Sequence, residues 1–139
     1  MTELPPLPQA IERFLRDEVP PDDVVVVVRA GPLTVEKLVE HATREQERYT
    51  RRGVPLPSIS VDAVVGGWTL EAILRDRLWS RSSYATTTVG VLRAAGFEML
   101  PTFQVPHYDV VLPAASPDEA GILLSLFSPA ERNTYRRRR

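Results

Sequence analysis

The chain has 139 residues, the length of one typical domain, and 43% of them are hydrophobic, which is enough to build a core without staples. It contains no cysteine, which excludes disulfides and thiolate metal sites and fits a reducing compartment. No apolar run approaches the length of a bilayer, and the first residues do not have the pattern of a signal peptide. We therefore expect a cytoplasmic protein with no membrane partner.

Charge is divided unevenly along the chain. The net charge is −1, but the last four residues are all arginine, which leaves −5 for the rest of the chain. Lys37 is the only lysine among 17 basic residues, a bias that suggests a GC-rich bacterial genome. A mildly acidic body does not by itself attract nucleic acid. We divide the chain into an N-terminal arm with a short helix (1–20), a single α+β domain (21–128) and a C-terminal extension with the arginine tail (129–139).

Hydrophobic spacing predicts the first two elements. Apolar residues recur at helical spacing over Gln9–Glu18, and Pro20 ends the predicted helix. Val24–Arg29 is a run of five valines followed by arginine. Valine favours the extended chain, and an uninterrupted apolar run indicates a strand covered on both faces. We therefore expect a central strand here, ended by Gly31.

A strand, a helix and a second strand follow one another in the next part of the chain. Thr34 is the predicted N-cap of a helix that continues to Tyr49 and is closed by Gly53. Apolar and polar residues alternate over Ser58–Ala63, which predicts a half-buried strand with its serines on the exposed face. Together with Val24–Arg29, these elements predict a β-α-β unit.

The middle of the chain predicts two helices. Thr69 caps the first, which continues to Leu78, and residues 80–83 form a loop. Thr86–Thr88 then opens a second short helix over Val89–Ala95.

The last third predicts a hairpin and a helix. Phe97–Thr102 and His107–Leu112 read as its two strands. Ser116-Pro-Asp-Glu119 is a capping box that begins a helix, and a similar pattern at Ser128 predicts a further helical turn. The fold class we expect is α+β: a small mixed β-sheet of about four strands, made of the β-α-β unit and the C-terminal hairpin, packed with helices.

Well-known catalytic motifs are absent, and the candidate catalytic residues are a set around one histidine. The chain has no P-loop, GxGxxG or GxSxG motif, and with two histidines and no cysteine we expect no metal and no cofactor. His107 opens a predicted strand, where alternation places it on one face with Asp109 and opposite Tyr108. His107 is the candidate general acid or base, with Asp109 or Tyr108 as its orienting partner. The alternative is a strand-edge histidine that only hydrogen-bonds locally.

Arg29, together with Arg93, is the candidate phosphate- or oxyanion-binding residue of this set. Arg29 ends the valine strand, where open sheets often bind ligands. A structural ion pair is the alternative at that position. An arginine on one strand and Ser58-x-Ser60 on another is similar to the arrangement in small ADP-ribosyltransferases. Those enzymes carry a Glu-x-Glu motif after the serines, whereas Glu45-Gln-Glu47 precedes them within a predicted helix. We assign no family on this basis.

The order of elements over residues 69–112, which is helix, loop, short helix and hairpin, is that of a winged helix-turn-helix. The loop over residues 103–106, where a wing would lie, is short and uncharged. The arginines of this segment are scattered, whereas a winged helix normally has a basic face. The candidate contacts to nucleic acid are Arg75, Arg81, Thr87 and Arg93.

The arginine tail is a further candidate for binding nucleic acid or an acidic partner, although a solvated end is the alternative. Its residues are Arg136, Arg137, Arg138 and Arg139. We therefore carry three functional hypotheses. The first is a bacterial-type binding or adaptor domain that acts on a protein or nucleic-acid partner, or on a second copy of itself. The second is a small toxin-type nucleic-acid enzyme, a ribonuclease or an ADP-ribosyltransferase-like protein, centred on His107 and Arg29. The third is a winged-helix DNA-binding regulator.

Overall fold

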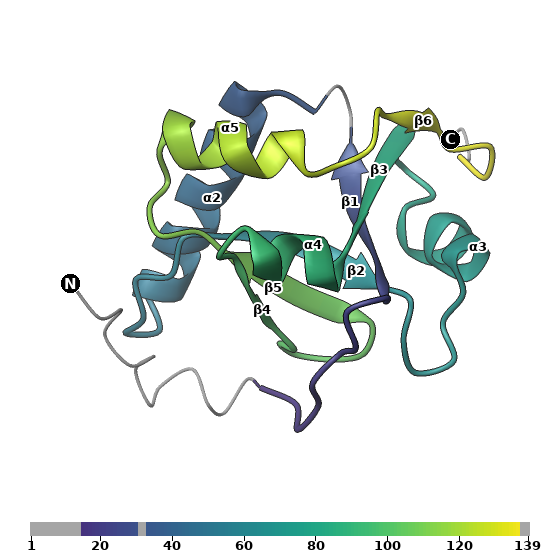
Figure 1. Ribbon diagram of the computed structural model, residues 1–139, viewed down its shortest axis with the longest axis horizontal. Coiled ribbons are helices and arrows are strands. Elements are labelled where there is room, and N and C mark those ends of the chain that lie inside the picture. The colour runs from purple at the N-terminus through teal and green to yellow at the C-terminus, as the bar shows by residue number, and fades with distance from the viewer. Residues whose placement is uncertain (1–14, 31–32, 137–139) are drawn as a thin grey trace.

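The computed structural model describes residues 15–30 and 33–136, apart from the side chains of Arg29 and Ala30. Its strands are β1 (Val25–Ala30), β2 (Ser58–Ala63), β3 (Ser83–Thr88), β4 (Glu98–Leu100), β5 (His107–Val111) and β6 (Glu131–Arg132). Its helices are α2 (Val35–Thr50), α3 (Leu70–Ala72) with the π-helical turn η1 (Ile73–Arg77), α4 (Val89–Ala94) and α5 (Pro117–Ser125). Within the described residues, the six strands form one sheet in the order β4-β5-β2-β1-β3-β6 (Figure 1).

The fold is α+β as expected, but the sheet differs from the predicted one in size and direction. It has six strands among the described residues instead of about four, and all its pairings are antiparallel. The predicted β-α-β unit is therefore wrong, because β1 pairs with β2 in opposite directions, with Val28 opposite Val61. The predicted hairpin is confirmed, since β4 and β5 pair directly with Met99 opposite Val110.

One face of the sheet carries the main core. The valine strand has Val26 on this face, and β2 contributes Ile59 and Val61, all almost fully buried. Helices α2, α4 and α5 cover these side chains, and α2 packs against α5 (Figure 1). We call this side the main core face.

Local signals account for the two longest helices. Thr34 caps α2 by accepting a hydrogen bond from the Lys37 backbone N–H, and Gly53 follows the helix at a φ of 83°. Ser116 caps α5 by accepting from the Glu119 backbone N–H, with proline in the first turn. Both helices were predicted from these residues.

Three segments differ from their predicted structure. The expected Gln9–Glu18 helix lies mostly outside the described residues, and its described end is extended, with Leu15 forming a β-bridge to Thr102. Residues 83–88, predicted as part of a loop and the opening of a helix, form β3 beside β1. The second helical turn expected after Ser128 is wrong, because Glu131–Arg132 pairs with β3 as a short edge strand.

Candidate functional site

The second face of the sheet, which we call the cleft face, carries a band of polar side chains at its centre. Ser58, Ser60 and Asp62 alternate with the core residues of β2 and so point to this face. His107 and Asp109 of β5 lie beside them, since Asp62 is opposite His107 and Ser60 is opposite Asp109. The serines were expected to be exposed, but Ser58 is fully buried and Ser60 is half-buried.

Two apolar clusters flank this polar band. On the β4–β5 side, Tyr49 at the end of α2 packs with Leu56 and Leu100. On the β1–β3 side, Ile73 and Leu78, around η1, pack against Val27. Of the residues in this band, Ser60 and His107 are half-buried and line the space between α2 and η1, whereas Ser58, Asp62 and Asp109 are buried.

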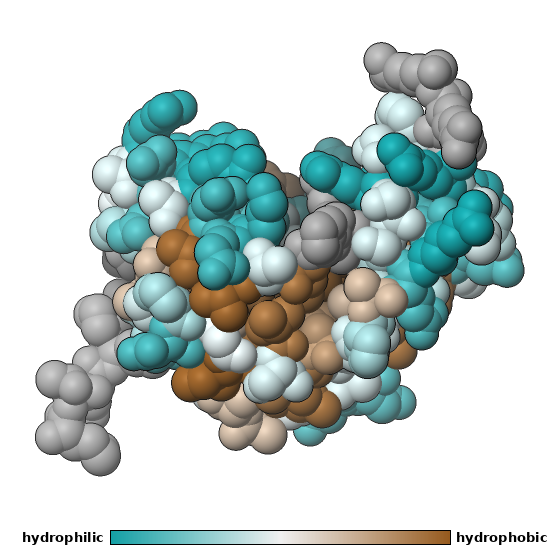
Figure 2. Space-filling view, turned by 90° about the horizontal axis from the view of Figure 1, so that it is seen from above, coloured by the Kyte–Doolittle hydropathy of each residue, from teal (hydrophilic) through white to brown (hydrophobic). Residues whose placement is uncertain are grey.

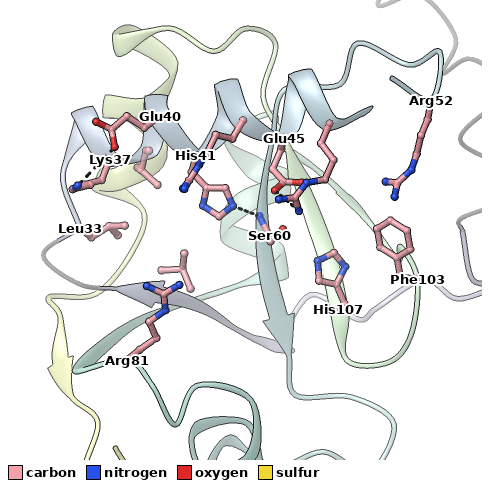
Figure 3. A pocket seen from close by; sticks show the side chains of 14 residues that line it. Leu33, Lys37, Glu40, His41, Glu45, Arg52, Ser60, Arg81, Phe103 and His107 are labelled. Carbon is pink, nitrogen blue, oxygen red and sulfur yellow. Dashed lines mark hydrogen bonds and ion pairs between the residues drawn. The ribbon is translucent and has the colours of Figure 1, made fainter. Parts of the chain in front are cut away.

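A cleft of about 800 Å³ opens over the band. Ser60 and His107 line it on the strands, His41 and Glu45 line it from α2, and Arg81 faces them from the far wall (Figure 3). Seen from above, the molecule is hollowed between two hydrophilic lobes (Figure 2). The site is therefore concave and polar.

Most of the charges in the cleft are positive. Five cationic side chains line it against two carboxylates, those of Glu40 and Glu45, although the whole chain has a net charge of −1. The lining of the cleft thus has an excess of positive charge although the chain as a whole is slightly negative, and a concave wall focuses that field on an anionic ligand. The cations are Lys37, Arg44, Arg48, Arg52 and Arg81.

His107 is held in one orientation by the residues behind it. Its Nδ1 lies 2.9 Å from the Thr102 hydroxyl and 3.2 Å from the Thr102 carbonyl oxygen. A carbonyl oxygen only accepts, and the Thr102 hydroxyl donates its own proton to Asp109 at 2.8 Å. Nδ1 therefore carries a proton and donates it, which leaves Nε2 as the nitrogen that meets the cleft (Figure 3).

Asp109 is the anchor of this chain of hydrogen bonds. Its carboxylate has no exposed surface and accepts from three hydroxyls, those of Ser58 at 3.1 Å, Thr102 at 2.8 Å and Tyr49. Burial raises the pKa of the Tyr49 hydroxyl, and the negative charge of Asp109 raises it further. An ionised carboxylate in the interior is costly unless it is well solvated by donors. Its position is explained by the orientation that it gives, through Thr102, to His107.

Glu45 is a second buried acid, on the opposite wall of the cleft. Only 7% of the residue is exposed, and its Oε1 lies 3.2 Å from Nη1 of Arg48. Burial raises the pKa of the Glu45 carboxyl, against the opposing effect of Arg48. The charge of Asp109 raises this pKa further and that of His107 lowers it, so these groups are electrostatically coupled. The cleft therefore contains a buried carboxyl whose pKa is raised above its ordinary value.

Phe103 stands at the mouth of the cleft in an uncommon backbone conformation. Its φ is 59°, and 42% of the residue is exposed. Its ring centre lies 5.6 Å from that of His107 and 6.5 Å from that of Tyr49, on which it stacks. A non-glycine residue with positive φ stores strain, which is common at binding sites.

Arg16 fixes the loop that carries Phe103. Its Nη1 donates to the carbonyl oxygens of Thr102, at 2.7 Å, and of His107, at 2.8 Å. Its Nη2 pairs with Glu18 at 2.7 Å, and its guanidinium lies 4.9 Å from the ring centre of Tyr108. The segment at the described N-terminal end thus holds both ends of the loop in place.

The structure brings part of the sequence-predicted set together. His107 and Arg81 both line the cleft, and Asp109 supports His107 through Thr102. Tyr108 points to the main core face, as its alternation with His107 predicted, and donates to Glu18. Burial, followed by this hydrogen bond, raises the pKa of Tyr108 to about 12.

The other predicted residues lie elsewhere. The backbone of Arg29 is in β1 opposite Tyr84, but its side chain lies outside the described part. Arg93 bonds Asp22 at 3.0 Å and is not among the residues that line the cleft. The rest are distributed over the surface and the core: Arg75 is paired with Asp76, Thr87 is buried opposite Val26, Arg136 is exposed, and residues 137–139 lie outside the described residues. The two predicted helices of this segment form, as α3 with η1 and as α4, but residues 83–88 between them are a strand of the sheet, so the helices are not joined by a loop as in a winged helix-turn-helix.

The polar face of α2 is the part of the site that we did not predict. His41, Glu45 and Arg48 follow one another at intervals of four and three residues, which places them on one side of α2, and Arg52 follows just beyond the end of the helix. That spacing was visible in the sequence, but a charged stripe on a helix is usually a solvated face. Phe103 gave no signal, because an exposed phenylalanine in a loop has no pattern.

Comparisons of the chain with protein-family models, with curated proteins and with solved structures find no match. Over the described residues, no group of three or more His, Cys, Asp or Glu side chains is placed to hold a metal ion. No helix in the same part of the chain has the length and apolar character needed to cross a membrane.

Proposed function

We propose that the cleft binds single-stranded RNA, with phosphates on its cationic side chains and a base on Phe103. Of the partner classes expected from the sequence, this selects nucleic acid and places it in a cleft instead of on a winged helix. The observation that carries the proposal is the set of five cationic side chains around one cleft of a chain whose net charge is −1. Lys and Arg provide most of the affinity of nucleic-acid sites through phosphate contacts.

The length of the basic wall favours a polymer over a single phosphate. Lys37 and Arg48 both lie on the cleft side of α2, eleven positions apart, and Arg52 follows just beyond the end of the helix. At a rise of about 1.5 Å per residue, Lys37 and Arg48 lie about 16 Å apart along the helix axis. That distance spans several consecutive phosphates of one strand.

Phe103 favours a single strand over a duplex. An exposed ring at the mouth of a basic cleft offers a surface for stacking, and bases are accessible to it only when they are unpaired. Such a stacking contact contributes about 1–3 kcal/mol per base. The Arg52 guanidinium, 5.6 Å from the ring centre, is placed to meet the neighbouring phosphate.

Titration of a fluorescent single-stranded RNA of mixed sequence, followed by anisotropy at several salt concentrations, tests the proposal. We expect Arg44→Gln to weaken binding and to reduce the salt dependence of log Kd by about 0.7, as for one lost phosphate contact on a single strand. Arg44 is exposed at the cleft and has no part in the core, so the variant is expected to fold normally.

Arg75→Gln is the matched control, because Arg75 is exposed but pairs with Asp76 away from the cleft. It is expected to bind RNA as the unchanged protein does. If Arg75→Gln weakens binding and Arg44→Gln does not, or if duplex DNA is the preferred ligand, the surface of residues 69–112 binds instead. Absence of salt-dependent binding to any of these nucleic acids would overturn the proposal and favour a protein partner.

A further inference from the structure

The two walls of the cleft present complementary proton-transfer groups. His107 meets the cleft through Nε2, because its Nδ1–H is engaged by Thr102. Glu45 faces it from α2, above Ser60 (Figure 3). A carboxylate on one side and an imidazole on the other is the arrangement that proton transfer to and from two oxygens requires.

We propose that the cleft cleaves the RNA that it binds, with Glu45 as general base and His107 as general acid; this rests on the proposed function. Glu45 takes the proton of a ribose 2′-hydroxyl, and the 2′-oxygen attacks the adjacent phosphorus. The bond from phosphorus to the 5′-oxygen breaks, and that oxygen takes the proton from His107 Nε2. The products are a 2′,3′-cyclic phosphate and a 5′-hydroxyl. Glu45 ends protonated and His107 neutral, and exchange with water resets both.

Cationic side chains supply the electrostatic part of the reaction. Charge on the non-bridging phosphate oxygens grows as the 2′-oxygen attacks, and fixed donors stabilise it best in a site shielded from water. Arg48 is next to Glu45 on α2, and Arg81 lines the same cleft on the side of Leu33 and Lys37 (Figure 3). Arg48 is therefore the side chain placed to meet the phosphate between the two catalytic residues, and Arg81 is placed to meet a neighbouring one.

Thr102 and Asp109 are positioning residues. They touch no substrate, but they keep the Nδ1 proton in place and thereby direct Nε2 into the cleft. The charged or titratable groups around His107 are Asp109 on its own strand, Asp62 opposite it on β2, Glu45 on α2, and Arg16, which donates to the His107 carbonyl oxygen. Those around Glu45 are Arg44, Arg48 and Tyr49 on its own helix, and His107 and Asp109 on β5.

The first experiment uses the full chain and two end-labelled strands of the same sequence, one RNA and one with 2′-O-methyl riboses, in the presence of EDTA. Both strands are expected to bind, but only the RNA to be cut, with the cyclic phosphate identified by mass spectrometry. His107→Ala, purified in parallel, is expected to lose about a hundredfold or more of the cleavage rate at saturating RNA concentrations, where a change in affinity does not affect the rate.

The second experiment measures the pH profile of cleavage. With the unchanged chain, the rate is expected to rise with pH as the Glu45 carboxyl ionises. Because burial raises the pKa of the Glu45 carboxyl, the rising limb lies above the range of an ordinary carboxylate. Glu45→Gln removes a buried charge, so it is expected to fold, to cleave slowly and to lose the rising limb. Asp109→Asn is expected to lower the rate while the rising limb stays.

The outcomes separate the two proposals. If RNA does not bind at all, the proposed function and the cleavage are both wrong. If RNA binds but is not cut, only the cleavage is wrong. Cutting that survives in His107→Ala, that also cuts the 2′-O-methyl strand, or that stops in EDTA contradicts the acid–base assignment.

Discussion

The burial and the hydrogen bonds of Asp109 depend on residues from several parts of the chain. Strand alternation placed it on the face of His107, and the structure agrees. What alternation does not give is its burial, which arises because Tyr49 of α2 lies over it and donates to it. Three hydroxyl donors around one carboxylate replace the water that it loses on burial, and each of these hydroxyls can be removed by a single substitution.

The Tyr49→Phe substitution tests this network. It removes one donor from a carboxylate with no exposed surface, so the free energy of unfolding is expected to fall by about 1–3 kcal/mol, as measured by urea denaturation. Tyr84→Phe is the control, because it removes the same hydroxyl from a surface bond to Glu131. That change is expected to cost about 0.5 kcal/mol or less. Equal effects of the two variants would contradict a special role for the Asp109 network.

Alkaline pH gives the same network a second readout. The folded protein holds the proton of Tyr49 more tightly than the unfolded chain does, so this stabilisation is fully present below pH 10 and is lost as the pH rises above it. Tyr49→Phe is therefore expected to unfold with a shallower pH dependence above that value. Tyr108 also contributes to the loss of stability as the pH rises towards its pKa of about 12, and this contribution remains in Tyr49→Phe.

At the scale of elements, the sequence predicted where α2 and the neighbouring strands are but not how they connect. A strand, a helix and a strand are compatible with parallel or antiparallel pairing. Here α2 begins beside the end of β1, and its Tyr49 reaches Asp109 of β5, so the helix crosses the strands instead of running back along them. The chain then re-enters the sheet at the end where it left. The direction of a helix relative to a sheet depends on packing, which hydrophobic spacing does not record.

The strand β3 was not predicted because threonine is favoured both at the N-cap of a helix and within a strand. Thr88 does cap α4, accepting from the Val91 backbone N–H at 3.3 Å. Thr86 and Thr87, however, belong to the strand that precedes it, as β-branched residues often do. The start of α4 was therefore predicted correctly from these residues, whereas the strand before it was not. The cleft wall on α2 and the strand order of the sheet were not predicted either, because both depend on which elements pack against each other in three dimensions.

The ion pair between η1 and β2 is an interaction between elements whose loss is expected to lower the stability strongly. Arg77 donates from Nε to Asp62 at 2.9 Å, and only 2% of the Asp62 side chain is exposed. Arg77→Met leaves that carboxylate buried without its cation, which is expected to cost about 3–5 kcal/mol of unfolding free energy. Arg75→Met breaks the exposed pair with Asp76 and is expected to cost about 1 kcal/mol at most.

A double substitution distinguishes the ion pair from simple packing. Asp62→Leu combined with Arg77→Met replaces both charges with apolar groups, which is close to neutral for many buried pairs. The double variant is expected to recover most of the loss seen with Arg77→Met alone in urea denaturation. A double variant as unstable as the single one would show that the stability comes instead from the contact of the Arg77 guanidinium with the Trp68 ring, 5.9 Å away, which methionine cannot reproduce.

At the scale of the whole molecule, the distribution of charge matters more than its sum. A net charge of −1 gave no reason to expect an anion site, yet five cationic side chains line one cleft. The sequence shows the arginine tail as the obvious basic feature, because its charges are consecutive. The cleft is assembled from residues between 28 and 107, and their separation along the chain conceals it.

Removing residues 136–139 decides which of these two basic features holds RNA. Asn133, just before the tail, is anchored to the carbonyl oxygens of Leu74 and Leu78 around η1, and Arg136 is exposed and is not among the residues that line the cleft. The truncated chain is therefore expected to keep more of its RNA affinity than Arg44→Gln does, and to cleave RNA at an unchanged rate. Anisotropy titrations at matched salt measure the first, and end-labelled RNA the second. A phosphate contact is lost when the side chain that makes it is removed, so the variant that loses affinity identifies the basic feature that binds RNA. If truncation abolishes binding while Arg44→Gln leaves it intact, the tail is the RNA-binding element and the charges of the cleft have another role.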